Sequence, residues 1–153
     1  VLVPPVCPSD ARHVRRAGTP VPTGIPHHLA TVEAHAKAAS LLTSDGLYCL
    51  NVAGEAGLSP VYREVRALGE SFEHIAAISD PAIVKGRRFG NVILLAAHRP
   101  LPLEEISRHV RRLPLPTIVV GQARLEEAAI GARLIYDRDI GWSPAEHDGD
   151  RPA

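Results

Sequence analysis

Two apolar segments constrain this chain more than any other feature. Residues 47–52 follow the turn signal at residues 44–46, and residues 91–97 stop before a proline-bracketed loop at 99–102. Both segments are nearly continuously apolar instead of alternating, which is typical of strands covered on both faces, as in a parallel sheet. We therefore expect an α/β domain built around buried strands.

Periodicity and turn residues predict the elements around these strands. Thr31 is a suitable N-cap for the first helix, and Glu33 lies in its first turn, where an acid favours the helix dipole. We expect helices at 29–42, 60–71, 103–113 and 123–130, strands at 47–52, 74–78, 91–97, 117–120 and 132–135, and a loop at 80–89.

The order of these elements predicts a topology. A helix separates the first two strands, which should therefore be parallel neighbours or near neighbours. A loop joins the next two strands, so a hairpin is expected there. The predicted fold class is α/β, with a mostly parallel sheet, an antiparallel hairpin near one edge and helices on the faces.

Composition narrows the function classes. Seventeen basic residues balance seventeen acidic ones, so the electrostatic footprint of a nucleic-acid binder is missing. No apolar run approaches about 20 residues, so we expect no membrane span and a cytoplasmic protein. Cys7 and Cys49 are far apart and form no disulfide framework, and Cys49 is interpreted as a small buried hydrophobe.

The proline distribution divides the chain into three parts. Residues 1–26 hold six prolines and are expected to form an arm that is neither a central strand nor a long helix. Residues 27–144 are the expected domain, and residues 145–153 are a polar tail.

Three groups of polar residues are candidates for chemistry. His27, His28, Glu33 and His35 could ligate a metal only by converging, but Glu33 and His35 are two apart on the helix and point in different directions. We therefore expect a polar helix start and no metal site. A second group, at residues 85–88, could hold an anionic ligand or form a solvated loop tip. Its cations are Lys85, Arg87 and Arg88.

Asp137 and Asp139, flanked by Tyr136 and Trp142, form the third group. Neighbouring carboxylates can act as an acid–base pair, although residues two apart on an extended segment face opposite ways. The glycine-rich residues 54–57 are an incomplete phosphate loop. The sequence contains no GxSxG, Walker or GxGxxG motif.

Several short segments together resemble one family. They are 25–33 (IPHHLATVE), 42–48 (LTSDGLY), Asn51-Val52, 65–72, 90–92 (GNV), 99–103 (RPLPL) and 132–134 followed by Asp137, Asp139 and Pro144. In order and spacing they are similar to the second half of bacterial spermidine synthase-like proteins over residues 20–144. The resemblance implies the C-terminal half of a class I S-adenosylmethionine-dependent methyltransferase fold, and therefore a partial Rossmann-like sheet.

The resemblance implies a reaction and a site. An aminopropyl group would pass from decarboxylated S-adenosylmethionine to putrescine, with the nucleoside over the carboxyl ends of the strands. Pro26 and His27 resemble the wall beside the adenine, and Asn51, at the end of its predicted strand, is a second cofactor-binding candidate. The glycine-rich cofactor loop, the ribose-binding acid and a securely matched catalytic aspartate are missing, so the catalytic residues stay unknown.

Three hypotheses follow. The first is a spermidine synthase-like half-domain that lacks the cofactor-binding half and is inactive alone. The second is a methyltransferase-like enzyme with a rebuilt site, in which Asp10, Glu55 or Asp137 supplies the carboxylate. The third is an interaction module that pairs through its open sheet edge, either as a homodimer or with a partner chain that supplies the missing half.

Overall fold

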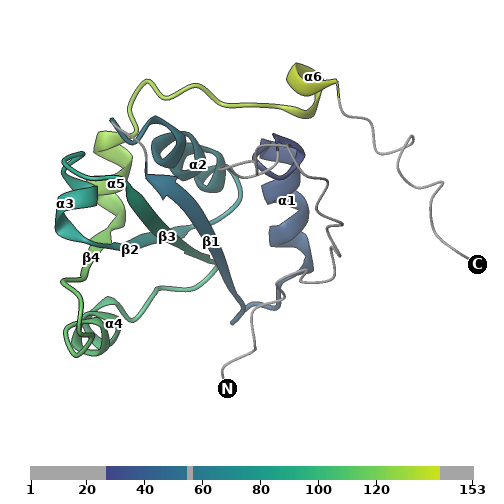
Figure 1. Cartoon of the computed structure of the whole chain (residues 1–153). Helices are drawn as coiled ribbons and strands as arrows, with labels where there is room; N and C mark the ends of the chain where they lie inside the picture. Colours follow the sequence, from purple (N-terminus) through teal and green to yellow (C-terminus); the bar gives the residue numbers. More distant parts are fainter. Residues whose placement is uncertain (1–26, 55–56, 142–153) are drawn as a thin grey trace, which may run out of the picture.

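The computed structural model describes residues 27–54 and 57–141 (Figure 1). The proline-rich arm with Asp10 and Pro26, Glu55 in the glycine-rich loop, and the tail with Trp142 and Pro144 lie outside the described residues. The elements, in chain order, are η1 (His27–Leu29), α1 (Val32–Leu41), β1 (Leu47–Gly54), α2 (Ser59–Gly69), β2 (His74–Ser79), α3 (Pro81–Val84), β3 (Gly90–Ala97), α4 (Leu103–Val110), β4 (Ile118–Gly121), α5 (Gln122–Ala128) and α6 (Asp137–Ile140).

The four strands form one sheet in the order β1-β3-β2-β4, and every neighbouring pair is antiparallel. The prediction of a mostly parallel sheet is therefore wrong. The expected hairpin between β2 and β3 exists, but its strands are the two central strands of the sheet. Strand β3 inserts between β1 and β2, so that Leu94 lies opposite Leu50 on one side and Ala77 on the other. Because β1 and β2 both run against β3, they point in the same direction without touching.

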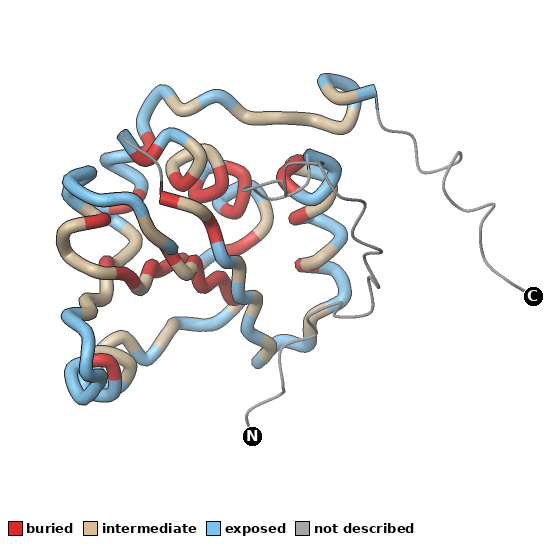
Figure 2. Tube along the Cα trace, viewed as in Figure 1, coloured by how far each residue is buried: buried red, intermediate tan, exposed pale blue. Residues whose placement is uncertain are grey.

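The core lies between the sheet and two helices. Helices α2 and α5 pack on one face of the sheet, α1 packs against α2, and α4 lies beside β4 (Figure 1). Buried segments concentrate in the strands and in α2 (Figure 2). Burying one aliphatic side chain of this kind contributes roughly 1.5–3 kcal/mol. The largest aliphatic side chains that are fully buried are Leu68, Ile75, Leu94, Val61 and Val65.

Strand β1 is an edge strand, paired on one side only within the described sheet. Its burial alternates at its start, with Leu47, Cys49 and Asn51 exposed and Leu50 packed against the core. The predictions of a strand covered on both faces and of a buried Cys49 are therefore wrong. The sequence pattern misled because helices cover only the Leu50 face of this strand, while the Cys49 face is left open.

The connections differ from expectation in two places. Residues 80–89 are not only loop, since they contain α3, whose N-cap Asp80 accepts a hydrogen bond from the Ala82 nitrogen at 2.7 Å. Residues 132–135 form no strand. They run past the start of α1, where the Val32 nitrogen donates to the Ile135 carbonyl at 2.9 Å. This contact replaces the sheet pairing that their apolar character predicted.

The N-cap prediction for α1 is confirmed, because Thr31 accepts a hydrogen bond from the Ala34 nitrogen at 3.2 Å. None of the helices in the described ranges combines the length and the apolar character that crossing a membrane requires.

Candidate functional site

The candidate site lies at the end of the sheet where β1 and β2 have their carboxyl ends. Both strands point the same way, so their last residues, Gly54 and Ser79, lie at one edge. Open parallel α/β sheets bind ligands outside the carboxyl ends of their strands, and β1 and β2 share one direction in this sheet. The start of α1 and the short helix α6 lie on the same side of the molecule as the arrowhead of β1 (Figure 1). Candidate polar residues from distant parts of the sequence therefore lie on this side of the molecule.

Two carboxylate candidates meet beside α1. The Asp137 backbone nitrogen donates to Glu33 Oε2 at 3.0 Å, although the residues are 104 positions apart. Asp139 Oδ2 accepts from the Tyr136 nitrogen at 3.0 Å, so Asp137 and Asp139 share the first turn of α6. Asp137 Oδ1 is buried without a hydrogen-bond partner among the described residues. The extended arrangement expected for the two aspartates is wrong, and the structure adds Glu33 to them.

The histidine cluster near residue 30 separates into two environments. His27 and His28 are exposed on η1, which contacts α6. His35 is completely buried, and its Nε2 lies 2.8 Å from Glu64 Oε2. Within residues 27–54 and 57–141, no three His, Cys, Asp or Glu side chains are arranged to hold a metal ion.

Glu64 is the residue that sequence reasoning missed. It lies on the apolar stripe of α2 with Val61, Val65 and Leu68, at the helical spacing that faces the core. A carboxylate on such a stripe needs a buried hydrogen-bond partner. An acid at an apolar position of the helix pattern was therefore the sequence signal that could have identified Glu64. The pair that it forms with His35 fixes α1 on α2.

Four rings pack one against the next, from His35 of this pair to His98 at the end of β3, and form an aromatic row. The Tyr48 ring lies 6.0 Å from the ring of His35 and stacks on Phe72 at 5.7 Å, and Phe72 stacks on His98 at 5.3 Å. Burial, together with the Glu64 charge, raises the pKa of Tyr48. The row ends where His98 Nδ1 bonds Glu73 Oε2 at 2.9 Å. This bond lowers the pKa of Glu73 and raises that of His98.

The cationic candidates Lys85, Arg87 and Arg88 are exposed on the connection between α3 and β3. Arg88 Nη1 lies 3.5 Å from Asp80 Oδ2. Gly86 adopts a φ of +66°, which ends the turn after α3. The connection is thus a folded turn that presents its cations to solvent.

Asn51 does not lie at the end of its strand, because β1 continues to Gly54. Its side chain is exposed on the face opposite Leu50, whereas Leu50 packs against the core. His27 lies on η1, and Pro26 is outside the described residues. The assignment of these three residues to a nucleoside stays a prediction.

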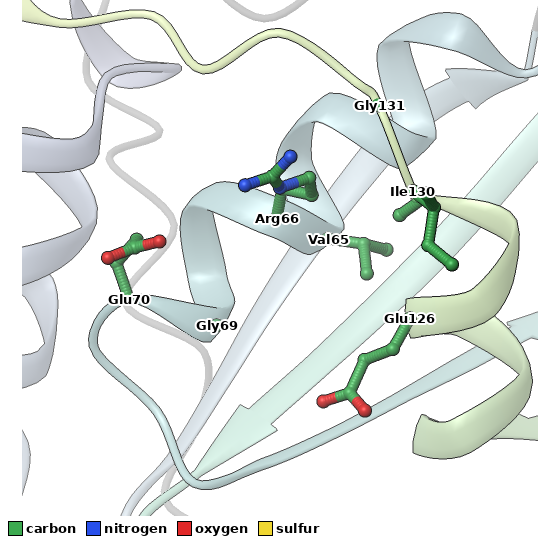
Figure 3. A pocket seen from close by; sticks show the side chains of 8 residues that line it. Val65, Arg66, Gly69, Glu70, Glu126, Ile130 and Gly131 are labelled. Atoms are coloured by element: carbon green, nitrogen blue, oxygen red, sulfur yellow. The ribbon is translucent and has the colours of Figure 1, made fainter.

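Two of the hollows on the described surface are shallow. One, of about 290 Å³, lies between α2 and α5 and is lined by Val65, Arg66 and Glu70 of α2 and its end and by Glu126 and Ile130 of α5 and its end (Figure 3). The other, of about 320 Å³, lies between the start of α3 and the segment after α4. Neither hollow is lined by His27 or Asn51.

Comparison with known proteins is informative at the level of structure. No family profile matches the chain, and no curated protein matches it significantly. A probable spermidine synthase from Corynebacterium glutamicum ATCC 13032 is similar, with a TM-score of 0.71 and 28% sequence identity over 81% of this chain. The fold is spermidine synthase-like. The match covers 46% of the neighbour, so this spermidine synthase-like chain spans less than half of its length.

Proposed function

We propose that this chain is the C-terminal half of a spermidine synthase-like transferase domain, which completes its sheet through β1 and is inactive alone. In the assembled domain, an aminopropyl group would pass from decarboxylated S-adenosylmethionine to an acceptor. The remaining strands would come from another polypeptide segment, whether a second chain or a part of the same one.

The observation that carries this proposal is the combination of the structural match with the open edge of β1. The match spans most of this chain and less than half of the neighbour. Beside the unpaired edge of β1, Leu47 is 49% exposed, and Leu41 of the adjacent helix is 74% exposed. An unpaired strand edge with apolar neighbours favours pairing with further strands.

The described residues do not fit the nucleoside cofactor as a complete site. Neither of the two hollows described above is lined by His27 or Asn51, and the sequence carries no GxGxxG loop to hold phosphate or sugar groups. What this half would supply is a polar group on η1, α1 and α6, where η1 with His27 contacts α6 and the Asp137 nitrogen donates to Glu33 Oε2. The catalytic steps would depend on residues from the other half.

One observation favours a second candidate, an enzyme with a rebuilt site. Asp137 Oδ1 is buried without a partner among the described residues, and Glu33 lies beside it. A bond from a ligand amine to this oxygen would offset the cost of burying it unpaired. This candidate requires the chain alone to bind an adenosyl thioether, whereas the half-domain does not require it.

Calorimetric titration with methylthioadenosine and S-adenosylmethionine separates the two candidates. The half-domain predicts no saturable binding by the folded chain at millimolar ligand. Saturable binding together with aminopropyl or methyl transfer by the chain alone would contradict it and support the rebuilt site.

Sedimentation tests the role of the β1 edge. We expect the chain to self-associate, or to associate with the missing half, through this edge. Leu47→Lys should abolish the association without unfolding the chain, because a charged residue on an edge strand opposes pairing. The control is Leu115→Lys, at a residue that is 73% exposed outside the sheet, which should leave association unchanged. A strictly monomeric wild-type chain that does not bind the missing half would contradict the proposal.

A further inference from the structure

The connection after α3, residues 85–89, is here named the basic loop. An apolar contact of α3 with the last residue of β1 and the first residue of β3 holds this loop at the carboxyl end of β1. Gly54 and Gly90 lie opposite each other in the last pair of β1 and β3, and Ile83 of α3 packs against both. A Cβ on Gly54 would lie 2.8 Å from Ile83 Cγ2, and one on Gly90 would clash with the same side chain. The two glycines therefore let α3 sit directly on the end of the sheet.

The same packing fixes the turn that carries the cations. The Gly86 nitrogen donates to the Ile83 carbonyl at 2.8 Å, and the Arg87 nitrogen donates to the Ala82 carbonyl at 2.9 Å. The basic loop also adjoins the β1–α2 connection, since a Cβ on Gly86 would lie 3.9 Å from the Gly57 nitrogen. The cations thus lie on a hydrogen-bonded turn at the carboxyl ends of β1 and β2, the side on which open parallel sheets bind ligands.

The charge of the basic loop is only partly balanced. Asp80 approaches Arg88 at 3.5 Å through Oδ2, while its Oδ1 accepts the capping hydrogen bond from the Ala82 nitrogen. Lys85 and Arg87 make no ion pair with any residue that the structure describes. Phe89, the next residue along, is 72% exposed beside these cations.

We propose that the basic loop binds the oxyanion group of a small molecule, so that the acceptor of the proposed transfer carries an anionic group and is not a simple diamine. Guanidinium groups match phosphate and carboxylate oxygens in charge and geometry. A cationic diamine would meet three like charges here. This inference deepens the proposed function and rests on it, because the proposed function is the reason for taking the carboxyl ends of β1 and β2 as the substrate side.

The test is an NMR titration of the full chain at low ionic strength, since exposed charges are screened by salt. The probes are inorganic pyrophosphate, succinate and putrescine. We expect pyrophosphate or succinate to cause saturable amide shifts at residues 85–89, and putrescine to cause none. Which anion binds more tightly identifies the oxyanion as phosphate or carboxylate.

Paired variants decide whether the site is specific. Arg87→Gln with Arg88→Gln should weaken anion binding about tenfold or more, because two charge-assisted contacts are lost. The control Lys37→Gln with Arg99→Gln removes the same charge elsewhere, because Lys37 is exposed on α1 and Arg99 donates to Ser44 Oγ at 3.3 Å. This control should leave binding unchanged.

The inference is overturned by an absence of saturable anion binding, by equal weakening in both double variants, or by putrescine binding at residues 85–89. These outcomes are independent of the proposed function, whose failure shows in sedimentation. The Arg87→Gln, Arg88→Gln variant should keep the wild-type association, because its changes lie away from the unpaired edge of β1.

Discussion

Replacing Glu64 with alanine should destabilise the chain strongly, because it leaves His35 buried without its partner. The two side chains are 0% and 4% exposed, and the atoms that join them are 2.8 Å apart. His35 Nδ1 already has no hydrogen-bond partner among the described residues, so the variant would leave the whole ring unsatisfied. Removing one member of a buried pair costs about 3–5 kcal/mol. That is a large share of the roughly 5–15 kcal/mol by which a domain is stable.

The chain contains a matched control for this prediction. His98 and Glu73 are the same residue types at nearly the same distance, 2.9 Å, but their side chains are 29% and 65% exposed. Solvent satisfies both groups when this pair is broken, so Glu73→Ala should leave the urea midpoint almost unchanged. Glu64→Gln keeps an acceptor for the ring and should cost less than Glu64→Ala, about 1–2 kcal/mol.

Urea denaturation followed by circular dichroism measures all three variants. The double replacement His35→Leu with Glu64→Leu adds a further check, because it removes both polar groups and should recover most of the stability lost in Glu64→Ala. If Glu64→Ala shifts the midpoint no more than Glu73→Ala does, burial is not what makes the His35–Glu64 pair important, and the reasoning is refuted.

Three further predictions concern other parts of the fold. The bond from His98 to Glu73 should stabilise the chain fully between pH 4.5 and pH 6.5, the ordinary pKa values of the carboxyl and the imidazole. Below this window the stabilisation should be lost as pH falls through the lowered pKa of Glu73. Above it, the stabilisation should be lost as pH rises through the raised pKa of His98. An NMR titration should place the His98 pKa above 6.5 and return it toward 6.5 in Glu73→Gln; an unchanged value in the variant would contradict this cause. Gly90→Ala should lower the free energy of unfolding by about 1–3 kcal/mol, because its Cβ would clash with Ile83. Adding Ile83→Val should recover part of that loss. Equal stability of the single and double variants would count against the packing argument. Cys49, exposed on the edge strand, should react with maleimide in a chain whose other cysteine is serine, and the reaction should slow as association covers β1; a rate independent of association would place the contact elsewhere.

Much of the local structure could be predicted from residue patterns. Thr31 as an N-cap, Pro60 at the start of α2, and the strands around residues 75 and 94 depend on backbone geometry and short-range side-chain effects. The polar start of the first helix was also predictable. For the site, the sequence identified Asp137, Glu33 and the cations of the basic loop as separate candidates, but it held no signal that Asp137 and Glu33 meet.

The amino-acid sequence by itself determined where most helices and strands begin, which helix faces are apolar, and which residues carry unusual charge. These properties depend on neighbours within a few positions along the chain. Only the tertiary structure decided that β3 inserts between β1 and β2, that Cys49 faces outward, and that Glu64 reaches His35. Strand order, exposure at a sheet edge and contacts between distant residues depend on how all the elements pack together, and local sequence patterns do not encode that packing.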